Sequence, residues 1–192
     1  DHFDAYGSLT EYQDAFIAFL QKLPSHGKVI THLADPHCRA VVERSGAPVV
    51  AADRFPLVAL RVPGRHMQEN AQCALALASV LGLPMEQSAE SLQTYAGAWR
   101  RMEVRGEILN GVTVIDDYGH HPAEIRATLQ ALRDAYPNRR IVCVYQPHTH
   151  DRTLALYDDF TTAFMNADLV VIPNIYDARN HCDRALVDED RF

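Results

Sequence analysis

The second half of the chain alternates apolar runs with helical patterns, and this alternation limits the possible folds more than any other feature of the sequence. The runs VTVID (112–116), RIVCVYQP (140–147) and DLVVIPNIY (168–176) are typical of strands. PAEIRATLQALRDAY (122–136) and LALYDDFTTAFMNA (154–167) have the apolar spacing of helices. Strands that alternate with helices form a mainly parallel sheet with helices on its faces. We therefore predict an α/β fold in which the continuous apolar run 140–147 is a strand buried on both faces.

The first half opens with a pattern typical of an amphipathic helix, at residues 8–24. Ser8 and Glu11 match the S-x-x-E capping box, in which each side chain accepts a hydrogen bond from a backbone amide at the start of a helix. Pro24 ends the pattern. Four apolar side chains recur at the spacing of one helical face, which predicts that this face is buried: Phe16, Phe19, Leu20 and Leu23.

Shorter elements fill the rest of the first half. We predict strands within 27–36, 47–53 and 56–64, and helices at 35–46, 70–84 and 85–97. Gly46 and Gly82 stand where the left-handed residue that ends a helix is expected.

A hairpin follows the last of these helices. MEVRGEI (102–108) and VTVID bracket Asn110-Gly111, the favoured two-residue hairpin turn. Because helical patterning gives way to a hairpin near Gly97, we place a domain boundary there. The chain then divides into residues 1–97 and residues 98–192.

The bulk composition excludes some classes of protein. The net charge is −7, which argues against general nucleic-acid binding. The chain contains no apolar run of about eighteen residues, so we expect no membrane span. We also find no signal peptide. The four cysteines are scattered without a C-x-x-C pair, as in a cytoplasmic protein with reduced thiols.

Polar residues gather at the ends of the three predicted strands of the second half. DDYGHHP, QPHTHDRT and PNIYDARN follow these strands in order. A single histidine at a strand end is more often a capping or solvated side chain. Ligands bind beyond the carboxyl ends of parallel strands, however, and three polar ends together favour a binding site. The residues concerned are Asp117, His120, His148, Arg152 and Asp177.

Two segments allow other interpretations, as a zinc site and as a nucleotide contact. The histidines of GHHP lack the i, i+4 spacing of a helical zinc site and have no cysteine nearby, so a structural zinc site is disfavoured. In VPGRHMQENA (62–71), His66 and Asn70 are four residues apart, and a side-chain amide there could bond the edge of a flat heterocycle. From the spacing alone, an ordinary helix start is the better interpretation.

Four segments together resemble the Mur ligase family, the ATP-dependent amino-acid ligases of peptidoglycan synthesis. They are DHFDAY (1–6), VPGRHMQENA, the run from Arg100 to Ile125, and QPHTHDRTLALYDDFTTAF (146–164). The chain is most similar to the members that join L-alanine to UDP-N-acetylmuramate. The relative that attaches a tripeptide to the same sugar nucleotide shares much of the pattern.

The resemblance implies a domain organisation. The family has a UDP-sugar-binding domain, a central ATPase domain and a C-terminal Rossmann-like domain. Residues 1–97 then correspond to the latter part of the central domain, and 98–192 to an incomplete C-terminal domain. The 192 residues contain neither the family's G-x-x-G-K-[ST] P-loop nor its magnesium-binding glutamate, so we expect this chain alone to be inactive. A non-catalytic nucleotide-binding module and a purely structural scaffold remain as alternatives.

The resemblance also implies roles for individual residues in a reaction that phosphorylates the muramyl carboxylate and then couples L-alanine to it. ATP and Mg²⁺ are the implied cofactors, and the oligomeric state is left open. His2 matches a metal ligand, His66 and Asn70 match the adenine-binding motif, and Asp117 matches a ribose contact. The implied catalytic residues are Arg101, His120 and Arg152, of which Arg101 contacts a phosphate group. The residues that match contacts to the amino acid or the sugar nucleotide, here called the substrate side, are Tyr118, His120, His148 and Arg152. Arg152 is assigned to the alanine carboxylate because a guanidinium binds a carboxylate in a bidentate manner. Three positions depart from the family motifs: Met67, Thr149 and His150.

Overall fold

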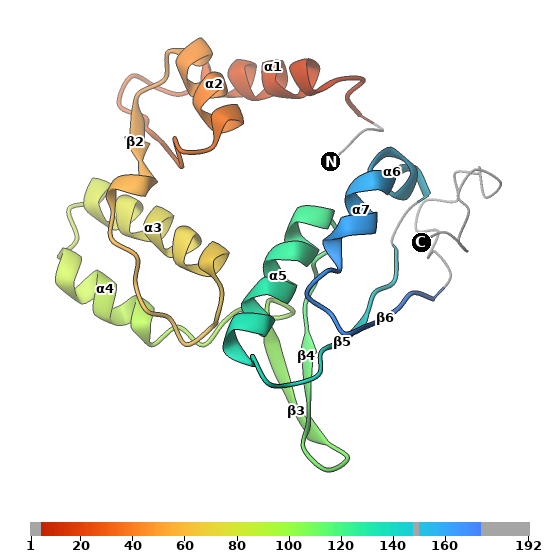
Figure 1. The fold of residues 1–192 in the computed structure, drawn as a ribbon. Coiled ribbons are helices and arrows are strands. Elements are labelled where there is room, and N and C mark those ends of the chain that lie inside the picture. The colour runs from red at the N-terminus through yellow and green to blue at the C-terminus, as the bar shows by residue number, and fades with distance from the viewer. Residues whose placement is uncertain (1–4, 148–149, 174–192) are drawn as a thin grey trace. The chain divides into compact units, whose positions relative to one another are not determined.

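The computed structural model describes residues 5–147 and 150–173 and shows two compact units. The first unit is Ala5–Ala96, and the described part of the second begins at Gly97. In both, helices are combined with short parallel strand pairs (Figure 1). The predicted α/β class is therefore confirmed. Within the described residues, no helix is both long enough and apolar enough to cross a membrane.

The first unit follows the predicted order of elements with one exception. Its elements are α1 (Leu9–Leu20), β1 (Val29–Thr31), α2 (Pro36–Ser45), β2 (Val49–Ala51), the 3-10 helix η1 (Ala52–Arg54), α3 (Arg65–Val80) and α4 (Met85–Gln93). β1 and β2 pair in parallel, with Ile30 opposite Val50. Gly46 ends α2 in the left-handed conformation, as predicted.

The exception is the strand predicted within 56–64, which is wrong. This segment has no regular structure, although Val58 and Val62 are buried. Pro56 and Pro63 lack the amide hydrogens that a strand ladder needs, so burial of the valines is achieved without strand pairing. The following helix, α3, begins at Arg65 rather than at Asn70.

Helix α1 starts as predicted but does not bury the predicted face. Ser8 caps it by accepting a hydrogen bond from the Glu11 amide at 3.2 Å, while the Glu11 carboxylate accepts from the Gly7 amide rather than from Ser8. No residue of α1 is buried, and Phe16 and Phe19 are 46% and 65% exposed. The prediction of a buried face is therefore wrong. Periodicity shows that a helix has an apolar face, but not that another element covers it.

The second unit begins with the predicted hairpin. Its elements are β3 (Glu103–Ile108), β4 (Val112–Asp116), α5 (Pro122–Ala135), β5 (Val142–Val144), α6 (His150–Ala155), α7 (Tyr157–Ala163) and β6 (Leu169–Val171). Ile108 pairs with Val112, so the turn has three residues rather than the predicted two. Leu109, Asn110 and Gly111 all have positive φ angles, which the turn accommodates partly through the glycine.

The strands after the hairpin pair as a parallel ribbon. β5 lies beside β6, with Cys143 opposite Val170, and β4 pairs only with β3 among the described residues. The helix predicted at 154–167 is divided into α6 and α7 near Leu156. Asp177 lies outside the described residues.

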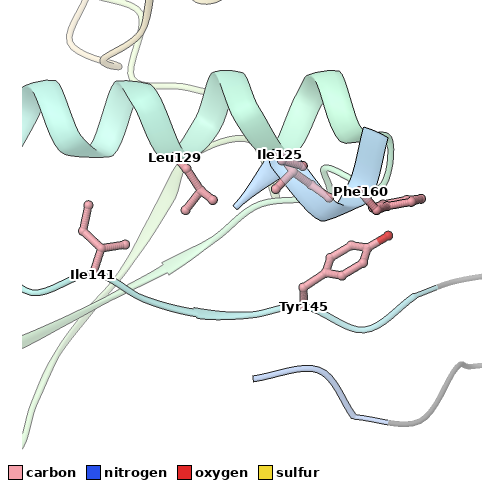
Figure 2. Close-up of a cluster of buried hydrophobic side chains, with 6 residues drawn as sticks. Ile125, Leu129, Ile141, Tyr145 and Phe160 are labelled. Atoms are coloured by element: carbon pink, nitrogen blue, oxygen red, sulfur yellow. The ribbon is translucent and has the colours of Figure 1, made fainter. Parts of the chain in front are cut away.

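The core of the second unit lies between α5, β5 and α7. Ile125 and Leu129 of α5 face Ile141 and Tyr145, with Phe160 of α7 beside them (Figure 2). In β5 itself, Val142 and Val144 are 51% and 71% exposed. The prediction that this strand is buried on both faces is therefore wrong, because in the described residues only one face is packed against helices.

Candidate functional site

The turn between β4 and α5 is fastened to residues 100–102, at the start of the second unit. The Asp117 carboxylate accepts one hydrogen bond from the Met102 amide at 2.9 Å and another from the Gly119 amide at 2.7 Å. The Tyr118 amide donates to the Arg100 carbonyl at 2.8 Å. Asp117 therefore holds the turn in place with both of its oxygens, whatever else it contacts.

The turn leads into α5 through a capping box centred on His121. His121 Nδ1 accepts a hydrogen bond from the Ala123 amide at 3.2 Å, which places the proton of the neutral ring on Nε2. The Glu124 carboxylate accepts from the amides of His120 and His121 at 3.0 and 3.1 Å. Pro122 occupies the first turn of the helix, as predicted. These bonds fix the backbone on which both histidines stand.

The charges around the cap set the protonation states of its members. Burial would raise the pKa of Glu124, but the amides of His120 and His121 and the charge of Arg101 hold it below its usual range. Burial lowers the pKa of His121, and the charge of Arg152 acts in the same direction. The cap thus combines an ionised carboxylate with a neutral imidazole.

Two arginines lie beside Tyr118. The guanidinium carbons of Arg100 and Arg101 are 4.8 and 6.0 Å from the centre of the Tyr118 ring, within the range of cation–π contact. Arg101 also approaches the Glu124 carboxylate at 3.5 Å, and its side chain is 46% exposed. The long ion pair and the exposure leave its guanidinium able to bind an anion.

The end of β5 meets the same turn. The Tyr145 hydroxyl donates a hydrogen bond to the His120 carbonyl at 3.3 Å. Burial raises the pKa of Tyr145, and the charge of Arg152 opposes this. Because Arg152 acts on both Tyr145 and His121, its guanidinium lies within electrostatic range of both. The two strand ends therefore form one polar region, here called the strand-end cluster: Arg101, Asp117, Tyr118, His120, His121, Glu124, Tyr145 and Arg152.

The other predicted site residues lie elsewhere. His66 and Asn70 are in the first two turns of α3, in the first unit, where His66 is half-buried and Asn70 exposed. Gly64 occupies the N-cap position of this helix, so neither side chain is an N-cap. His2 and His148 lie outside the described residues. The roles assigned to all of these residues stay predictions.

Sequence reasoning missed three members of the strand-end cluster. His121, Glu124 and Tyr145 were given no role, although H-P-x-E at 121–124 has the spacing of a capping box with histidine in place of serine. Tyr145 ends an apolar run and resembles a core residue by sequence. Only its hydroxyl contact with His120 reveals that it joins the two strand ends.

The described residues do not form a metal centre. No group of three or more histidine, cysteine or acidic side chains suited to a metal ion occurs in the described part of the chain. Cys38, Cys73 and Cys143 are free thiols.

Comparison with known proteins extends this description. Residues 100–188 match the family model of the Mur ligase, glutamate ligase domain. A UDP-N-acetylmuramate–L-alanine ligase of Clostridium novyi is 34% identical over 93% of this chain and 44% of its own length. The chain belongs to the Mur ligase family. The corresponding ligase of Desulfosudis oleivorans is 38% identical over 94% of this chain and 46% of its own length.

Solved structures of Mur ligases and their relatives agree with the fold. The UDP-N-acetylmuramate–alanine ligase of Thermotoga maritima superposes with a TM-score of 0.68 and 27% identity, over 92% of this chain and 44% of that one. The folylpolyglutamate synthase of Mycobacterium tuberculosis, solved with ADP and AMPPCP, gives a TM-score of 0.63 over 90% of this chain and 45% of that one. Its 20% identity supports the shared fold alone. The chain spans less than half the length of the curated Mur ligases that it matches.

Proposed function

We propose that the protein to which this chain belongs joins L-alanine to UDP-N-acetylmuramate, using ATP, as a step of peptidoglycan precursor synthesis. Relatives that carry this activity in their names are 34% to 38% identical over nearly all of the chain. The structural observation that supports the proposal most is the hydrogen bond between Tyr145 and His120. It links the end of β5, which precedes Arg152 in the sequence, to the turn that carries Tyr118 and His120.

The proposed reaction has two steps. The muramyl carboxylate attacks the γ-phosphorus of ATP, forming an acyl phosphate and releasing ADP. The amino group of alanine then attacks the acyl carbon, and phosphate leaves as the amide forms. Both steps require cationic groups near the transferring phosphate and precise placement of the amine.

The cationic side chains of the strand-end cluster suit these requirements. We assign Arg152 to the carboxylate of alanine, since a guanidinium can donate two parallel hydrogen bonds to it. We assign Arg101 to a phosphate group, because it is half-exposed and only loosely paired with Glu124. Tyr118 supports Arg101 through its ring, and His120 and His148 are assigned to the substrate side.

The nucleotide contacts are proposed on both units. Each Asp117 oxygen has a second lone pair beyond its amide bond, so the carboxylate can accept ribose hydroxyls while it holds the turn. On α3, exposed Asn70 and half-buried His66 are assigned to adenine. Met67, which replaces an asparagine of the family motif, is only 8% exposed. It therefore packs in the core and does not contribute to adenine binding. We assign Ala5–Ala96 to the ATP-binding domain and the unit from Gly97 to the C-terminal ligase domain.

The proposal keeps Mg²⁺ as the ion that accompanies the phosphates of ATP, where one or two carboxylates suffice beside phosphate oxygens and water. The described residues contain no group of three histidine, cysteine or acidic side chains suited to a metal ion, and His2, the metal ligand implied by the resemblance, lies outside them. No step is therefore assigned to a metal ion held by this chain.

The test is a coupled assay on the full-length gene product. Phosphate release should require ATP, UDP-N-acetylmuramate and L-alanine together, and should yield a product heavier by one alanyl residue. Phosphate release that depends on a tripeptide instead of alanine, or none in a folded full-length protein, would overturn the proposal.

A further inference from the structure

Three side chains of the first unit form a relay that the proposed function does not use. His32, just after β1, lies between Asp53 of η1 and Cys73 of α3. Its Nδ1 is 3.0 Å from the Asp53 carboxylate, and its Nε2 is 3.4 Å from the Cys73 sulfur. The second Asp53 oxygen accepts the Leu33 amide at 3.1 Å, which fixes the carboxylate. The order thiol, imidazole, carboxylate is that of a nucleophile with an oriented base.

The positions of the acceptors determine where the protons of His32 lie. A carboxylate beside Nδ1 requires that Nδ1 carry a proton and donate it. In the neutral ring, Nε2 then carries the lone pair, and it faces both the Cys73 sulfur at 3.4 Å and the closer Glu69 carbonyl, which can only accept. If Nε2 takes the thiol proton, it can donate to the Glu69 carbonyl, which lies 2.9 Å away. Both acceptors of an imidazolium are therefore already in place.

The surroundings of Cys73 make such a base necessary. Burial raises the pKa of the Cys73 thiol, and the nearby negative charge of Asp53 acts in the same direction. Free thiolate is therefore scarce at neutral pH. The Glu69 carboxylate, on the same helix, is paired with Arg65 at 2.9 Å. Cys73 is only half-buried, and the side chains of His32 and Asp53 are 26% and 33% exposed, so the relay lies near the surface of the unit.

We propose that Cys73 is a nucleophilic thiol activated by His32 and Asp53, and that it is a modification site for small uncharged electrophiles. With a haloacetamide, the sulfur attacks the methylene carbon, the S–C bond forms and the carbon–halogen bond breaks. The halide leaves with the bonding electrons. The thiol proton passes to His32 Nε2 and from there to water.

The same contacts also have a structural effect, since His32 links the end of β1 to η1 and α3. This role alone predicts that replacing His32 lowers stability but leaves the chemical reactivity of the Cys73 thiol unchanged in the folded chain. Activation predicts a change in reactivity. The two roles are therefore separated by measuring the rate of modification in folded protein.

The experiment is alkylation of the 192-residue chain with iodoacetamide near neutral pH, followed by peptide mass spectrometry. Cys38 and Cys143 of the same molecule serve as internal references, and each rate is divided by its rate in denaturant. We expect Cys73 to react about 10- to 100-fold faster than the references, at or below the range that a positioned general base contributes. His32→Gln should remove this advantage, and His26→Gln, at an exposed histidine of the same unit, should keep it.

Asp53→Asn provides a second test with a smaller change of structure. It removes the charged acceptor that orients the Nδ1 proton and also the negative charge that raises the Cys73 pKa, and we expect the first effect to be larger, so the Cys73 rate should fall. The pH–rate profile of Cys73 should also extend to lower pH than that of Cys143, and His32→Gln should abolish the extension. An unchanged Cys73 rate in folded His32→Gln and Asp53→Asn, judged by circular dichroism, would overturn the proposal. So would a wild-type Cys73 no faster than Cys38 and Cys143.

Discussion

The hydroxyl of Tyr145, at the end of β5, donates a hydrogen bond to the carbonyl of His120, in the turn after β4, at 3.3 Å. β4 and β5 are not paired in the described sheet, so this bond is a direct link between their ends. The aromatic ring of Tyr145 packs against Phe160 and Phe164, whose ring centres are 5.7 and 5.4 Å away. The core of the second unit thereby positions a polar contact of the strand-end cluster.

Replacing Tyr145 with phenylalanine should destabilise the chain slightly while leaving the core packed. The variant loses one hydrogen bond, and we expect a loss of about 0.5–1.5 kcal/mol in the free energy of unfolding. Urea denaturation measures this difference. Tyr136→Phe is the matched control, because the hydroxyl of Tyr136 has no comparable contact among the described residues, and it should change stability little. Equal effects of the two substitutions would contradict the role given to the Tyr145 hydroxyl.

Substitution of Gly119 by alanine should disturb Asp117. A β-carbon at Gly119 would lie 2.8 Å from an Asp117 oxygen, too close for an unstrained contact. That oxygen accepts a hydrogen bond from the Gly119 amide, and the other oxygen accepts one from the Met102 amide. A shift of the Asp117 carboxylate therefore weakens the hydrogen bonds that hold the turn. We expect a loss of about 1–3 kcal/mol in stability, measured by chemical denaturation.

Gly7→Ala is the control for this substitution. Its added carbon would meet the far end of the Glu11 side chain at 3.3 Å, and that flexible group can move. Its effect on stability should be clearly smaller. A neutral Gly119→Ala variant would show that the Asp117 carboxylate adapts without cost.

The stability of the chain should depend on pH through His121. Burial lowers its pKa in the folded chain, so protonation favours the unfolded state. The contribution is complete above the ordinary histidine value of 6.5 and is lost as the pH falls from there through the folded pKa. The stability that comes from Glu124 is complete above about pH 4.5 and is lost only at lower pH, since its pKa is held below 4.5.

His121→Asn separates capping from titration. Asparagine is a favoured N-cap residue and can still accept the Ala123 amide, but it does not titrate. We expect the free energy of unfolding to fall less steeply in this variant than in the wild type as the pH is lowered below 6.5. His26→Asn, at an exposed histidine, should keep the wild-type slope. The same slope in all three proteins would refute the assignment.

Phe160, in the hydrophobic core of the second unit, is 1% exposed. Phe160→Ala removes a large buried side chain between α5 and β5, and we expect a loss of about 3–5 kcal/mol in the free energy of unfolding. Met165→Ala removes an 82% exposed side chain and should cost less than about 0.5 kcal/mol. Thermal unfolding of both variants tests the difference. A small effect at Phe160 would mean that the described core is not the main one of this unit.

Much of the local structure could be predicted because it depends on neighbouring residues. The spacing of Ile125 and Leu129 predicts α5 and its buried face, and Asn110-Gly111 predicts a hairpin turn, although its length was wrong. The exposed Phe16 and Phe19 could not be predicted, because the covering of a helical face depends on distant elements.

Because the carboxyl ends of parallel strands meet at one edge of a sheet, the sequence predicts that Asp117 and His120 lie near Arg152. The effect of the Arg152 charge on the pKa of His121 and of Tyr145 is consistent with this prediction. The hydrogen bonds that the Asp117 carboxylate accepts from backbone amides could not be predicted. One of them depends on Met102, a residue far along the chain that is held in a left-handed conformation.

The most direct test of the central claim is the kinetic effect of Arg152→Ala in the full-length protein. If Arg152 binds the alanine carboxylate, the KM for L-alanine should rise about 10- to 100-fold, as expected for a lost hydrogen bond to a charged group, while the KM for ATP stays nearly constant. Arg140→Ala, at an exposed arginine before β5, should change neither. An unchanged alanine KM in a folded Arg152→Ala protein would contradict the account.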